Sequence, residues 1–398
     1  MQTSLKNQEK DFDNYQGLER VLDPKQRAWI EVKGKVIEKN VRQLRLILKK
    51  NCQLMAVVKA DGYGHDARLV SEYALKGGAS QLGVATLKEG IKLRSFGINA
   101  PILILGNLHT KKDLMTCFEN DLMPTISSLS ECLICNNIGK SYRNRFALHL
   151  KVDTGMSRLG FACDQFIQSF NKIKSFENIC IKGIYSHLSS ADESNALDPQ
   201  SNTQLQRYKF EELLKQINID LNNNTKIHLA NSAGMLLGKN FHFDMVRVGL
   251  SIYGYNPLTK INDLTLKPAL NLKVKVAFVR TIEEGVGVSY GNKFISNRKT
   301  KLAVLSIGYA DGIFRNLSGK INVIHKKKLY PQVGAITMDQ MMVDITDSND
   351  IDVGSTMLLL GSDGEKTISP TDWARKSNTI PWEILCSFKN RLPRVQVD

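Results

Sequence analysis

The sequence lacks any run of about 18 or more consecutive apolar residues, the length that a helix needs to span a bilayer. Its first 25 residues also lack the apolar core of a signal peptide, and they contain acidic residues that transit peptides avoid. This segment mixes Lys, Glu, Asp and Gln with few apolar side chains. We therefore expect no membrane span, and we expect residues 1–25 to form a polar tail.

Cysteine is scarce, with seven residues scattered over a chain of 398. An odd number without regular spacing argues against a disulfide framework and favours a reducing compartment, so we expect a cytoplasmic protein. The one close pair, Cys132 and Cys135, has neither a second pair nor nearby histidines that would complete a metal site. We interpret both as cysteines of a core or a helix surface, and we predict no bound metal.

Acidic residues are in deficit, with 39 Asp and Glu against 54 Lys and Arg, and the net charge is +15. Nucleic-acid binding would be one explanation, because clustered cations release counterions from phosphate backbones. The basic runs, such as HKKKLY at 325–330 and NRKTK at 297–301, are short and lack the interleaved aromatic residues that stack on bases. Solvated surface is the better explanation, and nucleic-acid binding is the remote alternative.

What the sequence does contain is a series of short apolar runs, separated by segments of helical period such as ARLVSEYALKGG. Eight runs precede residue 269: MAVVKA, QLGVA, PILILGN, MPTIS, FALHLKVDTG, IKGIYSHL, KIHLANS and DMVRVGLSIYG. Strands that alternate with helices pair in parallel, because each helix returns the chain to the same end of the sheet. The predicted fold class is therefore α/β, with a closed (β/α)8 TIM barrel over residues 26–268.

Polar residues stand at or near the ends of these runs: Lys59, Asn107, Ser127, Asp153, His187, Asn231 and Arg247. In a (β/α)8 barrel the carboxyl ends of the strands meet at one face, where catalytic groups can converge from several directions. We predict the active site at this face.

After about Pro268 the pattern changes to short alternating segments with turn signals: LNLKVKVAFVRTI, KLAVLSIG, KINVIHKK, QVGAITMDQMMVDI and STMLLLG. They predict a mostly antiparallel β domain over residues 269–398. Ser369 and Pro370 mark a short helix, as its N-cap and its first helical residue. The strand-like AWIEV of residues 28–32 precedes the first barrel helix, and we expect it to pair with the second domain.

Lys59 ends the first barrel strand, in the stretch MAVVKADGYGHDA. A lysine inside a pocket loses hydration, which disfavours its charged form and frees the amine as a nucleophile or base. Considered alone, Lys59 is better explained as a solvated residue at a strand end. Gly62 and Gly64, however, would let the backbone approach a ligand closely. Tyr63 and His65 add polar groups, and the combination suits a phosphate-bearing aldehyde held as an imine.

The motif KADGYGH resembles the lysine motif of the alanine racemases, a family of pyridoxal-phosphate enzymes. Further segments resemble the family in the same order over nearly the whole chain after the tail: HLKVDTGMSRLG, IYSHLSSAD, IHLANSAG, FDMVRVGLSIYG, VSYGNKF, IGYADG, ITMDQMMVDI and TIPWEIL. One motif would be weak, but the ordered set is specific. The resemblance implies an enzyme that interconverts L- and D-alanine with pyridoxal 5'-phosphate, supplying D-alanine for peptidoglycan. It also implies a homodimer whose active sites are shared across the interface.

The resemblance implies a role for each matching residue. Lys59 would hold the cofactor and act as one catalytic base, and Tyr290, contributed by the partner subunit, would act as the other. His187 would be a neighbour that helps to deprotonate Tyr290. By itself, VSYGNKF would be read as an ordinary turn. The residues expected around the cofactor are Lys59, Tyr63, His187, Asn231, Ser232, Arg247, Gly249, Leu250, Tyr253 and Trp382.

Arg247 would face the pyridine nitrogen of the cofactor. A guanidinium cannot accept a proton, so it would keep the ring neutral and shorten the life of a carbanion, whereas a carboxylate would prolong it. Without the resemblance, a salt bridge from Arg247 to a barrel carboxylate would be an equally good interpretation.

Lys151 and Arg158 match a family pair in which the lysine carries a carbamate and braces an arginine that binds the substrate carboxylate. The modification has an electrostatic reason, because two adjacent cations would repel each other. Met338 and Asp339 match the wall of the pocket that the second subunit contributes, and Tyr309 matches its entrance.

One position departs from the family pattern. In TIPWEIL the family usually has a tyrosine whose hydroxyl reaches the phosphate, and this chain has Trp382. Indole donates one hydrogen bond and accepts none, so the phosphate contact and the side-chain specificity are in question.

Three other functions compete with alanine racemisation. A serine or broad-specificity racemase, and a pyridoxal-phosphate-dependent decarboxylase, are possible on the same architecture, because a fold does not determine a reaction. Tyr290 and Arg247 favour a racemase, since a decarboxylase needs no proton donor on the second face. A non-catalytic cofactor carrier would keep Lys59 but would not need Tyr290.

Overall fold

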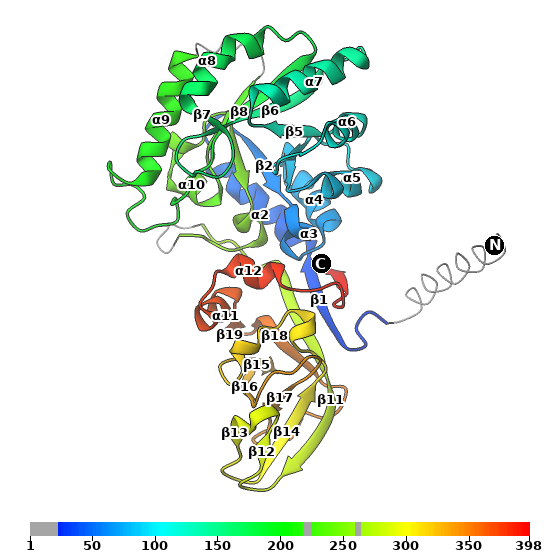
Figure 1. Ribbon diagram of the computed structural model, residues 1–398. Helices are drawn as coiled ribbons and strands as arrows, with labels where there is room; N and C mark the ends of the chain where they lie inside the picture. Colours follow the sequence, from blue (N-terminus) through cyan, green and yellow to red (C-terminus); the bar gives the residue numbers. More distant parts are fainter. Residues whose placement is uncertain (1–22, 218–224, 259–263) are drawn as a thin grey trace, which may run out of the picture. The chain divides into compact units, whose positions relative to one another are not determined.

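The computed structural model describes residues 23–217, 225–258 and 264–398, and its chain divides into two compact units (Figure 1). One unit comprises residues 33–269, and the other comprises residues 270–397 together with the described residues before Lys33. The predicted polar tail of residues 1–25 lies outside the described residues, except for its last three.

The first unit is built on a closed parallel barrel, as predicted. Its strands are β2 (Gln53–Val57), β3 (Gln81–Val84), β4 (Ile102–Ile104), β5 (Met123–Ile126), β6 (Phe146–Asp153), β8 (Ile179–Tyr185), β9 (Lys226–His228) and β10 (Met245–Val248). Neighbouring strands pair in the order β5-β4-β3-β2-β10-β9-β8-β6, and a further pairing of β5 with β6 closes the ring. Each strand corresponds to one of the eight predicted runs.

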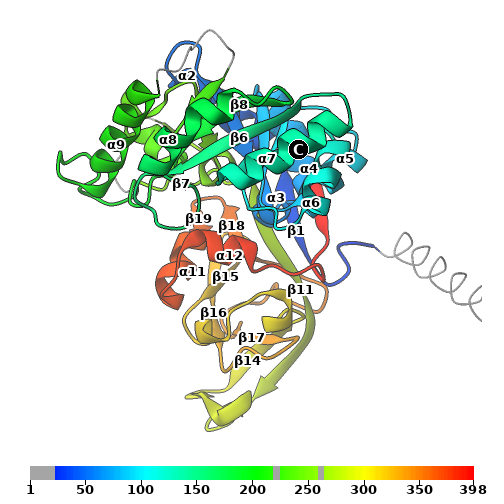
Figure 2. The same cartoon turned by 45° about the horizontal axis from the view of Figure 1, so that its top comes forward.

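Helices connect the strands and lie outside them (Figure 2). They are α2 (Gly34–Leu46), α4 (Ala67–Lys76), α5 (Leu87–Ser95), α6 (Lys111–Glu119), α7 (Leu129–Ser141), α8 (Cys163–Lys174), α9 (Asn202–Gln216) and α10 (Ser232–Leu237), with a two-residue strand, β7 (Phe161–Ala162), before α8. Helices α5, α6, α7 and α9 begin where a Thr or Ser hydroxyl accepts a backbone N–H of the first turn. Such caps satisfy donors that a helix start leaves unpaired, so they define where each helix begins.

The interior of the barrel changes from apolar to polar along the strands. Met55, Met123 and Met245 pack with Leu103 and Tyr185 in one buried cluster. Side chains two residues apart in a strand share a face, so Arg247 follows Met245 on the inner face of β10. The apolar layer therefore supports a polar layer nearer the carboxyl ends, where the site was predicted.

The Cys132–Cys135 pair lies on the buried face of α7. Burial raises the pKa of the Cys132 thiol to about 12 and raises that of Cys135 as well, so both remain protonated thiols. None of the seven cysteines, all of which lie in the described part of the chain, forms a disulfide. The interpretation of this pair as core cysteines is confirmed.

The second unit is a mostly antiparallel β structure. Its main sheet contains β1 (Ala28–Lys33), β11 (Leu270–Ile282), β14 (Thr300–Leu305), β15 (Asn322–His325), β16 (Lys328–Val333), β17 (Met341–Asp344), β18 (Thr356–Asp363), β19 (Lys366–Ile368) and β20 (Arg394–Val397). A hairpin of β12 (Gly287–Val288) and β13 (Phe294–Ile295) and two helices, α11 (Pro370–Ser377) and α12 (Pro381–Cys386), complete it. The order is β19-β18-β15-β16-β17-β14-β11-β1-β20.

Two details of this unit bear on the sequence predictions. Strand β1 pairs with β11, so the expected pairing of AWIEV with the second domain is confirmed. The helix start at Ser369 is also confirmed, because its hydroxyl accepts the N–H of Asp372. The segment QVGAITMDQMMVDI is not one strand, because Gly334 has φ +69° and takes the chain out of β16 before β17 begins at Met341.

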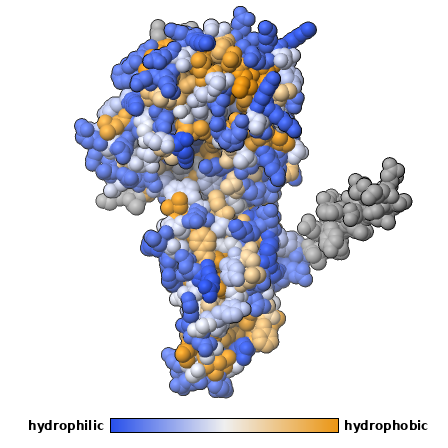
Figure 3. All heavy atoms as spheres, in the orientation of Figure 1, coloured by the Kyte–Doolittle hydropathy of each residue, from blue (hydrophilic) through white to orange (hydrophobic). Residues whose placement is uncertain are grey.

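The visible face of each unit is largely hydrophilic, with apolar residues interspersed (Figure 3). The basic runs are exposed and meet carboxylates: Lys326 pairs with Asp350, and Arg298 pairs with Asp347. This supports their interpretation as solvated surface. Among the described helices, none has the length and apolar character needed to cross a membrane.

A buried carboxylate holds the second unit together at its ends. Asp311 is fully buried, and Arg27 binds both of its oxygens, at 2.9 and 2.7 Å. Arg391 lies 3.6 Å from the same carboxylate. These contacts tie the chain before β1 and the chain before β20 to the loop after β14.

Removing Arg27 should destabilise this unit, because the buried Asp311 then keeps only the Gly308 N–H and the longer Arg391 contact. We expect Arg27→Met to lower the free energy of unfolding by about 3 kcal/mol, and Arg298→Met, which breaks only a surface pair, to have no measurable effect. Urea unfolding followed by tryptophan fluorescence is a suitable measurement, since all three tryptophans, Trp29, Trp373 and Trp382, belong to this unit. Equal stability of the two variants would contradict the role assigned to Arg27.

Candidate active site

Lys59 is followed by a left-handed turn. The segment α3 (Lys59–Tyr63) contains Ala60, Asp61 and Gly62 at φ between 52° and 64°, and Tyr63 also has a positive φ of 52°. The N–H of Gly62 donates to Val58 at 2.9 Å, which closes the turn. Residues other than glycine rarely adopt this conformation, so three such residues within four positions, Ala60, Asp61 and Tyr63, mark a specialised site.

Gly62 is explained by packing rather than by an approach to a ligand. A Cβ atom there would lie 2.9 Å from the side chain of Val70 on α4 and 3.2 Å from Ala67. The residue is buried, and its φ of +64° also favours glycine. The sequence correctly predicted an uncommon backbone conformation at Gly62. The group that approaches this glycine closely is helix α4, whereas a ligand was expected.

Tyr63, Ser232 and Gly249 meet at the carboxyl end of β10. A Cβ atom at Gly249 would lie 2.6 Å from the hydroxyl oxygen of Tyr63, so glycine leaves room for this hydroxyl. The Ser232 hydroxyl accepts the N–H of Gly249 at 3.0 Å. Hydroxyl and backbone N–H groups are the donors that bind phosphate, so these residues fit a phosphate-bearing cofactor.

Three other predicted cofactor residues support this region. The Asn231 side chain caps α10 by accepting the N–H of Gly234 at 2.9 Å. Leu250 begins the 3-10 helix η3 (Leu250–Tyr253) directly after Gly249. Tyr253 is fully buried; its hydroxyl donates to the Val57 carbonyl at 2.9 Å, and its ring packs on Tyr63 at 4.8 Å. Tyr253 thus holds Tyr63 in place.

Arg247 is a buried guanidinium without a carboxylate partner in the described part of the chain. It is 3% exposed, and its donors go to the Ser186 and Leu229 carbonyls and to two histidine nitrogens. Burial lowers its pKa to about 10, so it stays charged at neutral pH. The alternative of a salt bridge to a barrel carboxylate is therefore wrong: strong backbone acceptors take that place.

The guanidinium determines the tautomers of the neighbouring histidines. Arg247 donates to Nδ1 of His187 at 3.0 Å and to Nδ1 of His228 at 2.9 Å, so the proton of each neutral ring lies on Nε2. Nε2 of His228 then donates to Nδ1 of His149 at 2.9 Å. Burial, reinforced by Arg247, lowers the pKa of all three rings, that of His149 to about 3. All three are neutral at pH 7.

The sequence analysis missed this buried polar layer, which also includes Tyr185 and Thr125. The Tyr185 ring stacks on His228 at 4.6 Å, and its hydroxyl bonds Thr125 at 2.7 Å. Arg247 lies 4.9 Å from the centre of the same ring. A usable signal was present, because His149, Tyr185 and His228 are polar or aromatic residues inside otherwise apolar strand runs.

Lys151 is a buried amine beside other cations. It is 5% exposed and lies 5.5 Å from the centre of the Tyr185 ring. Burial, Arg247, Arg158 and Lys59 lower its pKa to about 8, against a smaller opposing effect of Asp153. A substantial fraction of this amine is therefore neutral, and nucleophilic, near pH 8.

Arg158 is held by the loop after β6. The Asp153 carboxylate accepts the N–H groups of Gly155 and Met156, both at 2.9 Å, and these bonds with those from Ser157 and Arg158 lower its pKa despite burial. The Arg158 side chain is exposed and forms no hydrogen bond or ion pair with another residue among those described. It is available to bind an anion.

The remaining predicted site residues belong to the second unit. Tyr290 is 70% exposed and borders a hollow of about 590 Å³ with Thr337 and Gln340. It follows Ser289, which has φ 65° and donates from its hydroxyl to the Ala335 carbonyl at 2.8 Å. Its turn is thus strained and anchored.

Tyr309 and Met338 lie on adjoining loops of this unit. The N–H of Tyr309 donates to Thr337, and that of Ala310 donates to Met338, both at 3.0 Å. Asp339, next to Met338, accepts from Arg391 at 2.8 Å. Trp382 is half-buried near the start of α12.

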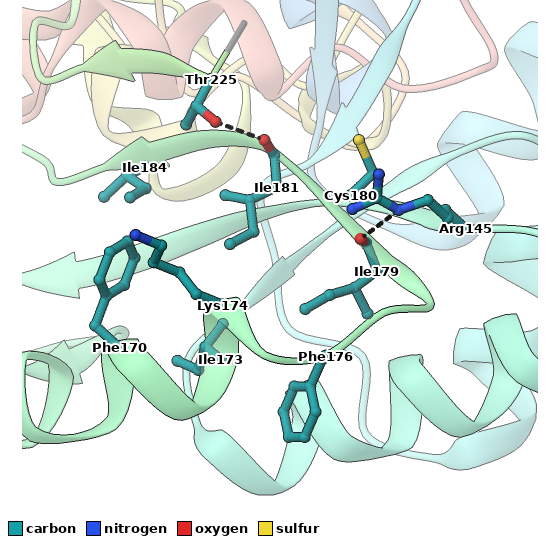
Figure 4. Close-up of a pocket in the computed structure, with 10 residues that line it drawn as sticks. All are labelled: Arg145, Phe170, Ile173, Lys174, Phe176, Ile179, Cys180, Ile181, Ile184 and Thr225. Carbon is teal, nitrogen blue, oxygen red and sulfur yellow. Dashed lines mark hydrogen bonds between the residues drawn. The ribbon is translucent and has the colours of Figure 1, made fainter. Parts of the chain in front are cut away.

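A separate cavity of about 220 Å³ lies in the barrel unit at the amino ends of β6 and β8 (Figure 4). Apolar residues of α8 and β8 line it, together with Lys174 and with Arg145, whose Nε donates to Ile179 at 3.0 Å. None of the predicted site residues borders it. The candidate site is therefore the group of residues at the carboxyl ends of the strands.

The chain is similar to known proteins along most of its length. Residues 32–257 match the family model "Alanine racemase, N-terminal domain", and residues 269–396 match "Alanine racemase, C-terminal domain". The alanine racemase of Prochlorococcus marinus is 52% identical over 94% of this chain and 97% of its own length; that of Nostoc sp. is 45% identical over 94% and 96%.

Solved structures of the same family share the fold. The alanine racemase of Clostridium difficile superposes with a TM-score of 0.86 at 32% identity, covering 93% of this chain and 96% of its own. The enzyme from Bartonella henselae, solved with covalently bound pyridoxal phosphate, gives 0.83 at 30% identity, covering 93% and 99%. The two family models together match most of the chain, and the chain belongs to the alanine racemase family.

Proposed function

We propose that this protein interconverts L- and D-alanine with pyridoxal 5'-phosphate bound at the carboxyl face of the barrel. The observation that carries the proposal is the excess of positive charge there: Lys59, Lys151, Arg158 and Arg247 influence one another, and the neighbouring Asp153 is already engaged by backbone N–H groups. Such a site favours anions, and the cofactor phosphate and the substrate carboxylate are both anionic. The Tyr63–Ser232–Gly249 group supplies donors for the phosphate.

The proposed role of each residue follows from its chemistry. The cofactor would be attached through Lys59 and would withdraw electrons from the substrate, which makes the Cα proton acidic. Lys59 would then exchange a proton with Cα on one face, and Tyr290 would do so on the other. Racemisation needs proton transfer on opposite faces, which one fixed base does poorly, and a positioned base typically contributes about 10² to 10⁴ in rate. Arg247 would donate to the ring nitrogen and could not protonate it.

His187 would assist Tyr290 in a different way from the one expected. Because Arg247 occupies Nδ1 of His187, the free nitrogen is Nε2 and carries the proton. His187 would therefore donate a hydrogen bond and stabilise the deprotonated form of Tyr290, rather than remove its proton.

Lys151 would carry a carbamate that orients Arg158. The neutral amine attacks the carbon of CO2, an N–C bond forms, and one proton is released to solvent. The product is an anion, so it replaces the repulsion between Lys151 and Arg158 by attraction. The lowered pKa of Lys151 supports this step, because only the neutral amine is a nucleophile.

The complete enzyme would be a cytoplasmic homodimer. Lys59 belongs to the barrel unit and Tyr290 to the other unit, and the partner's β domain would contribute Tyr290, Met338 and Asp339 to each site. Trp382 would take the place of the tyrosine that binds the phosphate in the family. Its indole would fill the space and offer the phosphate one N–H donor. D-alanine for peptidoglycan would be the product used by the cell.

Reduction with borohydride should attach the cofactor to Lys59. We expect peptide mapping of the reduced protein to find the pyridoxyl group on Lys59 alone, and we expect Lys59→Ala to lose conversion of L-alanine to D-alanine. Exposed Lys88 nearby serves as the internal control. A label on another lysine, or equal activity with L-serine, would require a different assignment.

Mixing two inactive variants should restore activity if the site is shared. Lys59→Ala and Tyr290→Phe chains, allowed to exchange subunits, form mixed dimers in which one site contains both intact residues. Recovered racemisation, measured against each variant alone, is the expected outcome. Exchange demonstrated by mass spectrometry without any recovery would argue that the site lies within one chain.

Carbamate formation should follow the pKa of Lys151. With ¹³C-labelled CO2 at constant partial pressure, a protein carbamate signal should grow between about pH 7 and pH 9, as the amine with pKa about 8 loses its proton. Lys151→Gln should abolish the signal, and Lys111→Gln, at an exposed helix position, should retain it. A pH-independent signal, or one that survives Lys151→Gln, would contradict the assignment.

A further inference from the structure

The left-handed turn after Lys59 needs support from outside itself. Ala60, Asp61 and Tyr63 each have φ between 52° and 54°, a conformation that is unfavourable for a residue with a Cβ atom. The N–H groups of Gly62 and Gly64 donate to the carbonyls of Val58 and Ala60, at 2.9 and 3.0 Å. The turn therefore persists because neighbouring groups hold it.

Glu89 is the neighbour that binds the residue next to Lys59. Its Oε1 accepts the N–H of Ala60 at 2.7 Å, and its Oε2 accepts the N–H of Ala85 at 2.7 Å and that of Thr86 at 3.2 Å. One carboxylate thus joins the start of the turn, the chain after β3 and the first turn of α5. Hydrogen bonds to an ionised acceptor are about twice as strong as neutral ones.

Other groups contact the turn further along: the Asp61 carboxylate accepts the Ala67 N–H at 3.2 Å, and the Tyr63 ring packs on Tyr253. Lys92, one helical turn along α5, lies 3.9 Å from the Asp61 carboxylate, and both side chains are well exposed, at 58% and 40%. Exposed pairs at this distance contribute little, because water screens them. Glu89 differs from these contacts because it binds the backbone N–H of Ala60, the residue directly after Lys59, at 2.7 Å.

We propose that Glu89 is a positioning residue: its carboxylate fixes the left-handed turn and thereby holds the Lys59 amine where it captures the cofactor. The inference deepens the proposed function and rests on Lys59 being the attachment point. Glu89 touches neither substrate nor cofactor in this scheme, and it acts through the Ala60 N–H.

The chain offers a matched control at Glu131. This residue has the same place in α7 as Glu89 in α5: the Ser128 hydroxyl accepts its N–H, and its Oε2 accepts the Ser127 N–H at 2.7 Å. It braces no left-handed turn. Glu89→Gln replaces one oxygen by an NH2 group and cannot accept from both Ala60 and Ala85, whereas Glu131→Gln keeps the one acceptor that it needs.

The first experiment uses the full-length protein stripped of cofactor with hydroxylamine. Pyridoxal phosphate binding should weaken about tenfold in Glu89→Gln, the loss expected for one charged hydrogen bond, and should stay within about twofold of wild type in Glu131→Gln. Acetic anhydride footprinting of the same proteins should show severalfold faster acetylation of Lys59 relative to Lys88 in Glu89→Gln alone. If Glu89 acted only as a helix cap, both substitutions would change cofactor affinity and Lys59 acetylation to the same extent.

Ala60→Gly provides the rescue. Glycine adopts positive φ without steric cost, so the turn then needs less support. The double variant Ala60→Gly with Glu89→Gln should recover part of the cofactor affinity and the wild-type footprint. It also replaces the single variant if that does not fold.

The outcomes separate this inference from the proposed function. If wild type takes up the cofactor, two results would overturn the role of Glu89. One is that Glu89→Gln and Glu131→Gln have the same cofactor affinity and the same Lys59 acetylation. The other is that the double variant recovers no cofactor affinity. If wild type takes up no cofactor and faster Lys59 acetylation appears in Glu89→Gln alone, the proposed function is overturned. Glu89 then remains the support of the turn.

Discussion

The buried guanidinium of Arg247 is the interaction on which the site depends. It is charged inside the barrel, yet its partners are carbonyl oxygens and neutral imidazole nitrogens. Burying a charge costs less free energy when all of its hydrogen-bond donors have acceptors. Each of these acceptors belongs to a barrel strand or to the residues directly after it. One consequence is that burial and Arg247, which donates to the Nδ1 atoms of His187 and His228, lower the pKa of both rings and keep them neutral at pH 7.

The same charge affects groups that do not touch it. It lowers the pKa of Lys151 and reinforces the effect of burial on His149, so the barrel interior combines a neutral histidine network with a partly neutral amine. The barrel makes this arrangement possible because inward positions alternate along each strand. Met245 and Arg247 share the inner face of β10, one in the apolar layer and one in the polar layer.

Strained backbone accompanies the proposed proton-transfer residues in both units. Lys59 precedes three non-glycine residues with positive φ, and Tyr290 follows Ser289 at φ 65°. In each case a hydrogen bond fixes the turn from outside: Glu89 holds Ala60, and the Ser289 hydroxyl holds the Ala335 carbonyl. Proton transfer requires well-defined positions, and a turn held in an uncommon conformation has few alternatives available to it.

The sequence by itself determined the architecture and predicted the residues of the proposed site. Eight apolar runs separated by helical segments can form a closed parallel sheet, and polar residues at or near their ends must gather at one face, as Lys59 and Arg247 illustrate. Only the tertiary structure decided which side chains are protonated and which group supports the turn after Lys59. The tautomer of His187, the lowered pKa of Lys151 and the bond from Glu89 to Ala60 all depend on distances between residues far apart in the chain. A residue pattern cannot specify those distances, because a shift of about one ångström changes which nitrogen accepts a proton and which carboxylate reaches a backbone N–H.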